Sequence, residues 1–437
     1  MWARYPVPRP ERTWARRSFG TWQSGRMANA ANDITVRPTE AHEVRTACDT
    51  MRAALLTGPI SDDDWAKAND GWDPEMHHSI TAWDGDRCVG HAGSYALETR
   101  VPGGAVLPTA GVTRIGVLAT HTRMGLLSRM IHRLLVDERG RGAIITSLRA
   151  SEAVIYGRFG YGLAGDGVNV SVDPRKVRPI AGADSGSFRL LRSEEVLDLL
   201  PGLYERVARR AGTVMRNASL WKRYFASMLD GSKAEFVVVH TALDGTDDGY
   251  AHYTADWVLH PFEHPVGKAE LFDLVGSTPA VELALWNFLT NIDLLEVIVA
   301  EERPVDDVLR RAAHDMRGYT VKQRYDEQWL RLLDVHAALS ARVYRPGTVS
   351  IAVTDPMFGD NTGLYRIIDG EVTRAKADPE TADIRAGIDA ISAAYLGSTT
   401  WTELCATGKA LARDGGAAER ADDVFAHRPA AWCGTFF

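Results

Sequence analysis

The chain has 437 residues, of which 45% are hydrophobic and 24% are charged, a composition that excludes a fibre or a disordered chain and predicts a soluble globular protein. At roughly 100–200 residues per domain, the length predicts two to four domains. Lysine and arginine number 50 against 57 aspartates and glutamates, so the formal net charge is −7. This balance argues against a protein that binds nucleic acid over a large surface.

The cysteines and the hydropathy pattern indicate the compartment. Cys48, Cys88, Cys405 and Cys433 are scattered without a CxxC pair, which excludes a disulfide scaffold and a zinc knuckle. No run of about 18 apolar residues occurs, so no membrane span is expected. Metalloprotease, serine-hydrolase and EF-hand patterns are absent too. We therefore expect a cytoplasmic protein without a metal.

Residues 1–33 are predicted to be a disordered basic extension that takes no part in the fold. The first 26 residues contain six arginines against a single acid, Glu11, and they have no apolar core of the kind a secretory signal needs.

The pattern of residues 34–180 predicts one α/β domain. Short segments of alternating apolar residues predict strands, and apolar residues at three- and four-residue steps predict helices. Strands are expected at 34–37, 78–83, 87–98, 105–118, 143–148 and 168–172. Helices are expected at 41–56, from about 120 to 138, and at 151–158. The first four strands form a meander, and a helix then leads to the fifth strand.

Two further domains are predicted. Residues 187–325 repeat the same order more weakly, with helices at 193–210 and 278–290 and strands at 235–241, 249–257, 267–274 and 294–300. We predict an internal repeat of one architecture, with two unrelated α/β domains as the alternative. Residues 330–437 are predicted to form a separate α+β domain. Its helices are expected near 334–342, 379–396 and 401–412, and its strands at 348–354, 363–368 and 370–376.

The most informative segment is GVTRIGVLATHTRMGLL at residues 111–127. A strand ends there near Val117, and the pattern predicts that a helix begins near Thr122. The first amides of a helix are unpaired and its dipole is positive at that end, so the junction can bind a phosphate. Gly125 allows a diphosphate to approach the backbone closely, and Arg123 adds a charged donor. An ordinary strand–loop–helix junction is the alternative.

The meander before this junction disfavours a dinucleotide-binding unit, and no Walker motif occurs. A meander followed by a phosphate-binding helix is the order of GCN5-related N-acetyltransferases (GNATs). Three segments resemble the enhanced-intracellular-survival (Eis) family of these enzymes: VLPTAGVTRIGVLATHTRMGLLSRMI at 106–131, RASEAVIYGRFGYGLA at 149–164 and WLRLLDVHAALSARVY at 329–344. The resemblance implies two tandem GNAT-like domains, a sterol-carrier-like C-terminal domain, acetyl-CoA as cosubstrate and a homohexamer.

The resemblance also implies roles for individual residues. Tyr156 matches the general acid of the family, and Phe437 matches the terminal residue whose α-carboxylate is the general base. The expected cosubstrate-binding residues are Ile115, Val117, Thr122, Arg123, Gly125, Leu126 and Ser151. The expected amine-binding residues are Leu55, Trp65 and Phe436. A buried packing role for Tyr156 and a frayed end at Phe437 are the alternatives, although the ending WCGTFF is unusually apolar for a free tail.

The chain also departs from the family. Thr122 and Met124 flank Arg123 where the family has consecutive arginines, and Leu55 and Phe436 stand where a well-known member has acids. The leading interpretation is an acetyl-CoA-dependent N-acetyltransferase for primary amines of small polycationic molecules of the aminoglycoside type, which would link it to antibiotic resistance. A protein or peptide lysine acetyltransferase, and a non-catalytic lipid- or small-molecule-binding protein built on degenerate GNAT domains, remain alternatives.

Overall fold

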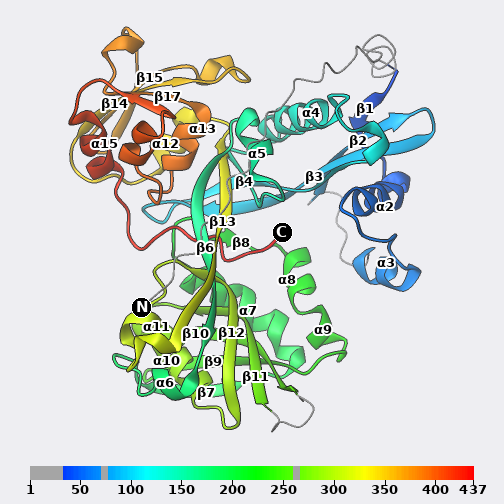
Figure 1. Ribbon diagram of the computed structural model, residues 1–437, viewed down its shortest axis with the longest axis vertical. Helices are drawn as coiled ribbons and strands as arrows, with labels where there is room; N and C mark the ends of the chain where they lie inside the picture. The colour runs from blue at the N-terminus through cyan, green and yellow to red at the C-terminus, as the bar shows by residue number, and fades with distance from the viewer. Residues whose placement is uncertain (1–32, 70–76, 259–265) are drawn as a thin grey trace, which may run out of the picture.

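The computed structural model describes residues 33–69, 77–258 and 266–437, and the predicted basic extension lies outside these ranges apart from Asp33. Within them the chain forms two α/β units that share one large sheet, and a third unit with a smaller sheet of its own (Figure 1). No helix in the described ranges is long and apolar enough to cross a membrane.

The first unit follows the predicted order of elements. Its strands are β1 (Thr35–Pro38), β2 (His77–Asp84), β3 (Arg87–Arg100), β4 (Val106–Val117), β5 (Ile145–Leu148) and β6 (Gly162–Val172). Its helices are α2 (Val44–Ala54), α3 (Asp62–Asn69), α4 (Leu126–Gly140), α5 (Ala153–Tyr156) and α6 (Pro174–Val177). Strands β1 to β4 are antiparallel neighbours. The apolar stripe of α4, with Met130 and Leu134 fully buried, packs on this meander.

The second unit repeats this arrangement. Its strands are β7 (Gly186–Leu190), β8 (Val214–Met215), β9 (Glu235–Ala242), β10 (Asp247–Val258), β11 (Val266–Gly276), β12 (Leu295–Pro304) and β13 (Tyr319–Leu332). Its helices are α7 (Ser193–Val207), α8 (Ala218–Tyr224), α9 (Ala226–Leu229), α10 (Pro279–Thr290) and α11 (Leu309–Ala312). β12 pairs with β11 in parallel, as β5 does with β4, and in both units a helix connects the two strands.

The two units exchange their last strands. β13, at the end of the second unit, lies between β5 and β6 of the first, while β6 pairs with β12 of the second. The described strands therefore form one continuous sheet of 13 strands. Sequence analysis missed β13, because residues 320–324 in its first half are exposed, are polar except for Val321, and show no alternation.

The third unit contains β14 (Thr348–Thr354), β15 (Gly363–Ile368), β16 (Glu371–Ala375), β17 (Ile384–Gly387) and β18 (Ala410–Ala412), with helices α12 (Val335–Ala341), α13 (Ile388–Ala394), α14 (Trp401–Ala406) and α15 (Ala417–Phe425). The predicted helix over 379–396 is wrong in its first part, since β17 pairs there in parallel with β14. The predicted helix over 401–412 ends early, because β18 pairs with β17. Both strands are too short to show a strand period in the sequence.

The last residues return to the first two units. The segment after α15, drawn in red in Figure 1, leaves the third unit, crosses between the other two and ends near β8. We call residues 430–437 the terminal strap. Its members Trp432, Cys433 and Phe437 are buried.

Candidate active site

A gap opens between two parallel strands of the first unit. β4 pairs with β5 only from Thr109 to Gly111, although β4 continues to Val117. Beyond Gly111, β4 and β5 no longer pair within the described chain, whereas β5 pairs with β13 along its other edge. Ile115 and Val117 lie on the stretch of β4 beyond this pairing, where backbone groups on the β5 side can bind a ligand.

A β-bulge shapes this stretch of β4. His91 pairs with Gly116 and Gly93 with Thr113, so Arg114 and Ile115 together oppose one residue of β3. Arg114 has a positive φ of 54°, and its carbonyl oxygen lies 2.6 Å from Nδ1 of His91. A carbonyl can only accept, so Nδ1 carries the proton. Burial lowers the pKa of His91 to about 4, which keeps the ring neutral. The bulge bends β4 where the gap begins.

The loop at the end of β4 has an unusual backbone. Arg123 and Gly125 have positive φ values of 65° and 76°, and α4 begins only at Leu126 rather than near Thr122 as predicted. The two left-handed residues prevent an earlier helical start. No side chain caps α4, and a Cβ at position 125 would have no protein atom within 4 Å. The backbone therefore borders open space at Gly125, directly before the first residue of α4, with the exposed Thr122 and Arg123 beside it.

Tyr156 lies on the other side of the gap, on the short helix α5 that follows β5. Its side chain is buried, with the ring centroid 6.0 Å from that of Tyr161. Burial raises the pKa of Tyr156 above its usual value, and a hydrogen bond with Ser151 offsets part of this effect. The phenol therefore keeps its proton at neutral pH.

The end of the chain reaches β4 at the start of the gap. A Cβ at Gly111 would lie 3.2 Å from the Phe437 ring, and Gly111 is the last residue of β4 paired with β5. Phe437 is 5% exposed and belongs to a small apolar cluster that includes Tyr95 and Leu97 of β3. The structure thus brings the last residue of the chain to the strand that carries Ile115 and Val117.

The three residues expected to bind the amine are less closely gathered. Leu55, at the end of α2, is 46% exposed. The preceding Ala54 packs on Gly116 of β4, where an added Cβ would lie 2.7 Å from the Ala54 Cβ. Phe436 is 58% exposed. Trp65, on α3, has the guanidinium of Arg45 at 5.9 Å from its ring centre. This contact joins α3 to α2.

The corresponding gap of the second unit is filled. β11 pairs with β12 only as far as Leu271, but Arg303 of β12 donates to the Leu274 carbonyl at 2.8 Å. The ring of Trp432 from the terminal strap lies 5.6 Å from the same guanidinium. Thr278 caps α10, and a buried glutamate, Glu282, lies in its first turn with its pKa raised by burial to about 7. An acid at a capped helix start opposes phosphate binding, so the candidate site is in the first unit.

Sequence analysis missed the residues that hold the terminal strap. They include Arg149, Arg216, Arg223, Tyr224, Glu302 and Glu327. Glu327 is on the unpredicted strand β13, and burial raises its pKa to about 7 although Arg149 lies 3.2 Å away. Arg149 directly follows β5 and is the first residue of the segment RASEAVIYGRFGYGLA, so its position beside a predicted site residue, Tyr156, is a signal that the sequence offered.

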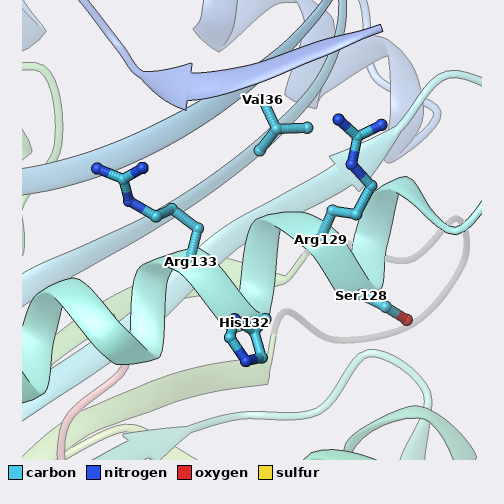
Figure 2. A pocket seen from close by; sticks show the side chains of 5 residues that line it. All are labelled: Val36, Ser128, Arg129, His132 and Arg133. Carbon is cyan, nitrogen blue, oxygen red and sulfur yellow. The ribbon is translucent and has the colours of Figure 1, made fainter. Parts of the chain in front are cut away.

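A separate groove of about 450 Å³ runs along α4 next to β1. Figure 2 shows Arg129 and Arg133 reaching from α4 toward the strand of Val36. Arg129 donates to the Ile34 carbonyl at 2.7 Å, and Arg133 binds Asp137 at 2.9 Å. Both guanidinium groups thus bind protein groups. No cluster of three His, Cys, Asp or Glu side chains suited to a metal ion occurs in the part of the chain described here.

Comparisons with known proteins agree with this architecture. Residues 35–164 match an acetyltransferase (GNAT) domain family, residues 212–338 match a second acetyltransferase (GNAT) domain family, and residues 335–434 match the sterol carrier protein domain. The fold and the open gap thus define an N-acetyltransferase with two GNAT domains followed by a sterol-carrier-like domain, and the predicted internal repeat is confirmed.

Relatives narrow the class to one family. An uncharacterized N-acetyltransferase of Streptomyces avermitilis is 36% identical over 82% of this chain and 89% of its own length. N-acetyltransferase Eis of Mycobacterium tuberculosis is 32% identical over 79% of this chain and 85% of its length. Crystalline Eis1 from Mycobacterium abscessus superposes with a TM-score of 0.82 at 33% identity, covering 92% of this chain and 100% of that one. The chain belongs to the Eis family of GNAT N-acetyltransferases.

Proposed function

We propose that the protein transfers the acetyl group of acetyl-CoA to a primary amine of a small polycationic molecule of the aminoglycoside type, at the gap between β4 and β5. The observation that carries this proposal is the position of Phe437. Its buried ring lies on Gly111, where the two strands part, so the chain ends beside the place where a GNAT thioester would lie. The open start of α4 and the filled gap of the second unit support the choice of the first unit.

Acetyl-CoA would extend from the start of α4 into the gap. The diphosphate would bind the amides of Gly125 and Leu126, with Thr122 and Arg123 beside it, because the helix start supplies unpaired donors and a positive dipole. The pantetheine chain would follow the backbone of Ile115 and Val117. Ser151, bound to the phenol on the facing side, would border the thioester end.

The reaction would proceed by direct attack of the amine nitrogen on the thioester carbonyl carbon. The α-carboxylate of Phe437 takes the proton that the amine loses, and the Val117 amide binds the oxygen that becomes negative in the tetrahedral intermediate. The C–S bond then breaks, and Tyr156 donates its phenolic proton to the departing thiolate. The products are the N-acetyl amide and CoA with a free thiol; the Phe437 carboxyl group then releases its proton to solvent, and Tyr156 regains one from solvent.

The Tyr156 phenol must carry a proton before the reaction, whereas the Phe437 carboxylate must be ionised. Because the pKa of the Tyr156 phenol is raised, the phenol stays protonated until the thiolate forms. A thiol has a pKa near 8.5, below that of the phenol, so the proton moves to the sulfur only while the C–S bond breaks and only if the phenol is held in contact with it. An α-carboxylate has a pKa near 3.5 in water, so it is ionised at neutral pH and can accept the proton that the amine loses.

The amine would enter past Leu55, Trp65 and Phe436. Leu55 and Phe436 are neutral and exposed, so they supply apolar contact rather than attraction for a cation. Several relatives are named N-acetyltransferase Eis, and the acceptor of an N-acetyltransferase is an amine, which supports an amine acceptor here. We further propose a cytoplasmic location, since the four cysteines are free thiols that suit a reducing compartment. We also propose a homohexamer, which rests on the resemblance to the Eis family alone.

The test is a steady-state assay of acetyl-CoA consumption with kanamycin-type amines, spermidine and a lysine-containing peptide. Mass spectrometry then counts the acetyl groups added to each amine. Turnover of the aminoglycosides with at least one added acetyl group supports the proposal. Acetylation of the peptide alone would identify a lysine acetyltransferase, and lipid co-purification without any CoA binding would identify a binding protein. Light scattering of the purified chain checks the hexamer.

A further inference from the structure

The terminal strap is held by side chains in addition to two backbone hydrogen bonds: the Val214 amide of β8 donates to the Cys433 carbonyl at 3.2 Å, and the Trp432 amide donates to the Ala211 carbonyl at 2.9 Å. The carbonyl of Gly434 accepts from the buried Arg216 at 2.7 Å, and the carbonyl of Phe436 accepts from Arg223 at 2.8 Å. Tyr224 accepts a hydrogen bond from the Phe436 amide. Arg216, Arg223 and Tyr224 all belong to the second unit. That unit, whose own gap is filled, therefore fixes the end of the chain at the open gap of the first.

The most deeply buried of the groups that bind the strap is the carboxylate of Glu327, on the exchanged strand β13. Glu327 is fully buried, and its two oxygens accept from the amides of Cys433 at 3.1 Å and Gly434 at 3.3 Å. Arg149 donates to Glu327 at 3.2 Å and to Glu302 at 2.6 Å. A carboxylate removed from water is retained only where a cation and donors compensate for the lost hydration. Here two consecutive strap amides supply part of that compensation.

We propose that Glu327 is a positioning residue for acetyl transfer: by binding the amides of Cys433 and Gly434, its carboxylate sets the place of the Phe437 carboxylate at the gap. The inference rests on the proposed function, in which that terminal carboxylate is the general base. Gly434 is three residues from the end of the chain, a span of at most about 10 Å, so a shift at its amide is carried to the terminus. Misplacement of a reacting group by 1 Å can lower a rate about 100-fold.

Glu327→Gln in the full-length chain tests the inference. Glutamine keeps the size of the side chain, but its amide nitrogen can only donate and would face a strap amide or Arg149. At pH 8.5 we expect kcat to fall at least about tenfold, while KM for acetyl-CoA stays within threefold, since Glu327 does not lie at the proposed CoA contacts. We also expect a carboxypeptidase that removes aromatic C-terminal residues to release Phe437 at least about tenfold faster than from the wild type.

Asp166→Asn is the matched control. Asp166 is a carboxylate on the neighbouring strand β6, paired with Arg324 of β13 at 2.6 Å, and among the described residues no hydrogen bond or ion pair joins its side chain to the strap. It should leave kcat and carboxypeptidase release unchanged. Glu327→Asp, which keeps the charge but draws the oxygens back by one methylene, should change both readouts in the same direction as Glu327→Gln, and it serves if the glutamine variant does not fold.

The outcomes separate the inference from the proposed function. Wild-type kcat and wild-type protection of Phe437 in a folded Glu327 variant would overturn the inference. So would a lower kcat with Phe437 still fully protected, because catalysis would then be lost without any change at the terminus. If two glycines added after Phe437 leave kcat intact, the terminal carboxylate is not the base, and the proposed function fails whatever the Glu327 variants do.

Discussion

Replacement of Tyr156 by phenylalanine is the sharpest test of the catalytic assignment, because it removes one oxygen atom from a buried site. If the phenol protonates the departing thiolate, its loss lowers kcat by about 10²–10⁴-fold, the usual contribution of a positioned acid, or about 3–5 kcal/mol in activation free energy. The free energy of unfolding should fall by only about 1 kcal/mol, the worth of the hydrogen bond with Ser151. KM for acetyl-CoA should be nearly unchanged.

Tyr161→Phe is the matched control for this experiment. The Tyr161 ring lies 6.0 Å from that of Tyr156, and its hydroxyl is 2.9 Å from that of Thr146 in the core. Loss of this hydroxyl should therefore lower the free energy of unfolding by about 1 kcal/mol, as in Tyr156→Phe, with little change in kcat. The assay is release of the CoA thiol followed at pH 8 with the best amine of the panel. A Tyr156→Phe enzyme within threefold of the wild type, or equal losses in both variants, would refute the reasoning.

Three further predictions concern the other parts of the site. Two glycines added after Phe437 should displace the carboxylate and lower kcat at least about 100-fold with CoA binding intact, measured by calorimetry. Gly125→Val should raise KM for acetyl-CoA about tenfold or more. Gly142→Val, at the other end of α4, also has a positive φ (97° against 76°) and no protein atom within 4 Å of an added Cβ, so it should destabilise the fold without this effect. His91→Leu should destabilise the fold by about 1–3 kcal/mol, as the Arg114 carbonyl loses its donor. Burial lowers the pKa of His91 from 6.5 to about 4, so the unfolded chain binds the proton at a higher pH than the folded chain does. The free energy of unfolding of the wild type should therefore fall by up to about 3 kcal/mol as the pH drops from 6.5 to 4. Chemical denaturation across this pH range should show a smaller fall for the His91→Leu variant.

The elements near the site could be predicted from sequence because local patterns determine them. β4 ends at Val117 as expected, and the apolar steps of Met130 and Leu134 mark α4. The start of α4 at Leu126 could not be predicted, since the left-handed conformation of Arg123 depends on the surrounding fold and not on its residue type. The roles assigned to Tyr156 and Phe437 stay predictions.

The support of the terminal strap was beyond sequence reasoning for a different reason. Glu327 and Cys433 are separated by 106 positions, and Arg216 and Gly434 by 218. The first pair involves the exchanged strand β13, and the second forms where the strap passes the segment after β8; no periodicity or spacing encodes either approach. The apolar ending did predict burial, which Phe437 shows, but not which side chains hold it.

The most direct test of the account is a crystal structure of the full chain with CoA bound. We expect the CoA sulfur between β4 and β5, within hydrogen-bonding distance of the Tyr156 hydroxyl, with the diphosphate on the amides of Gly125 and Leu126 and the Phe437 carboxylate facing the same space. CoA bound in the second unit or along the α4 groove, or a Phe437 carboxylate turned away from the sulfur, would contradict it.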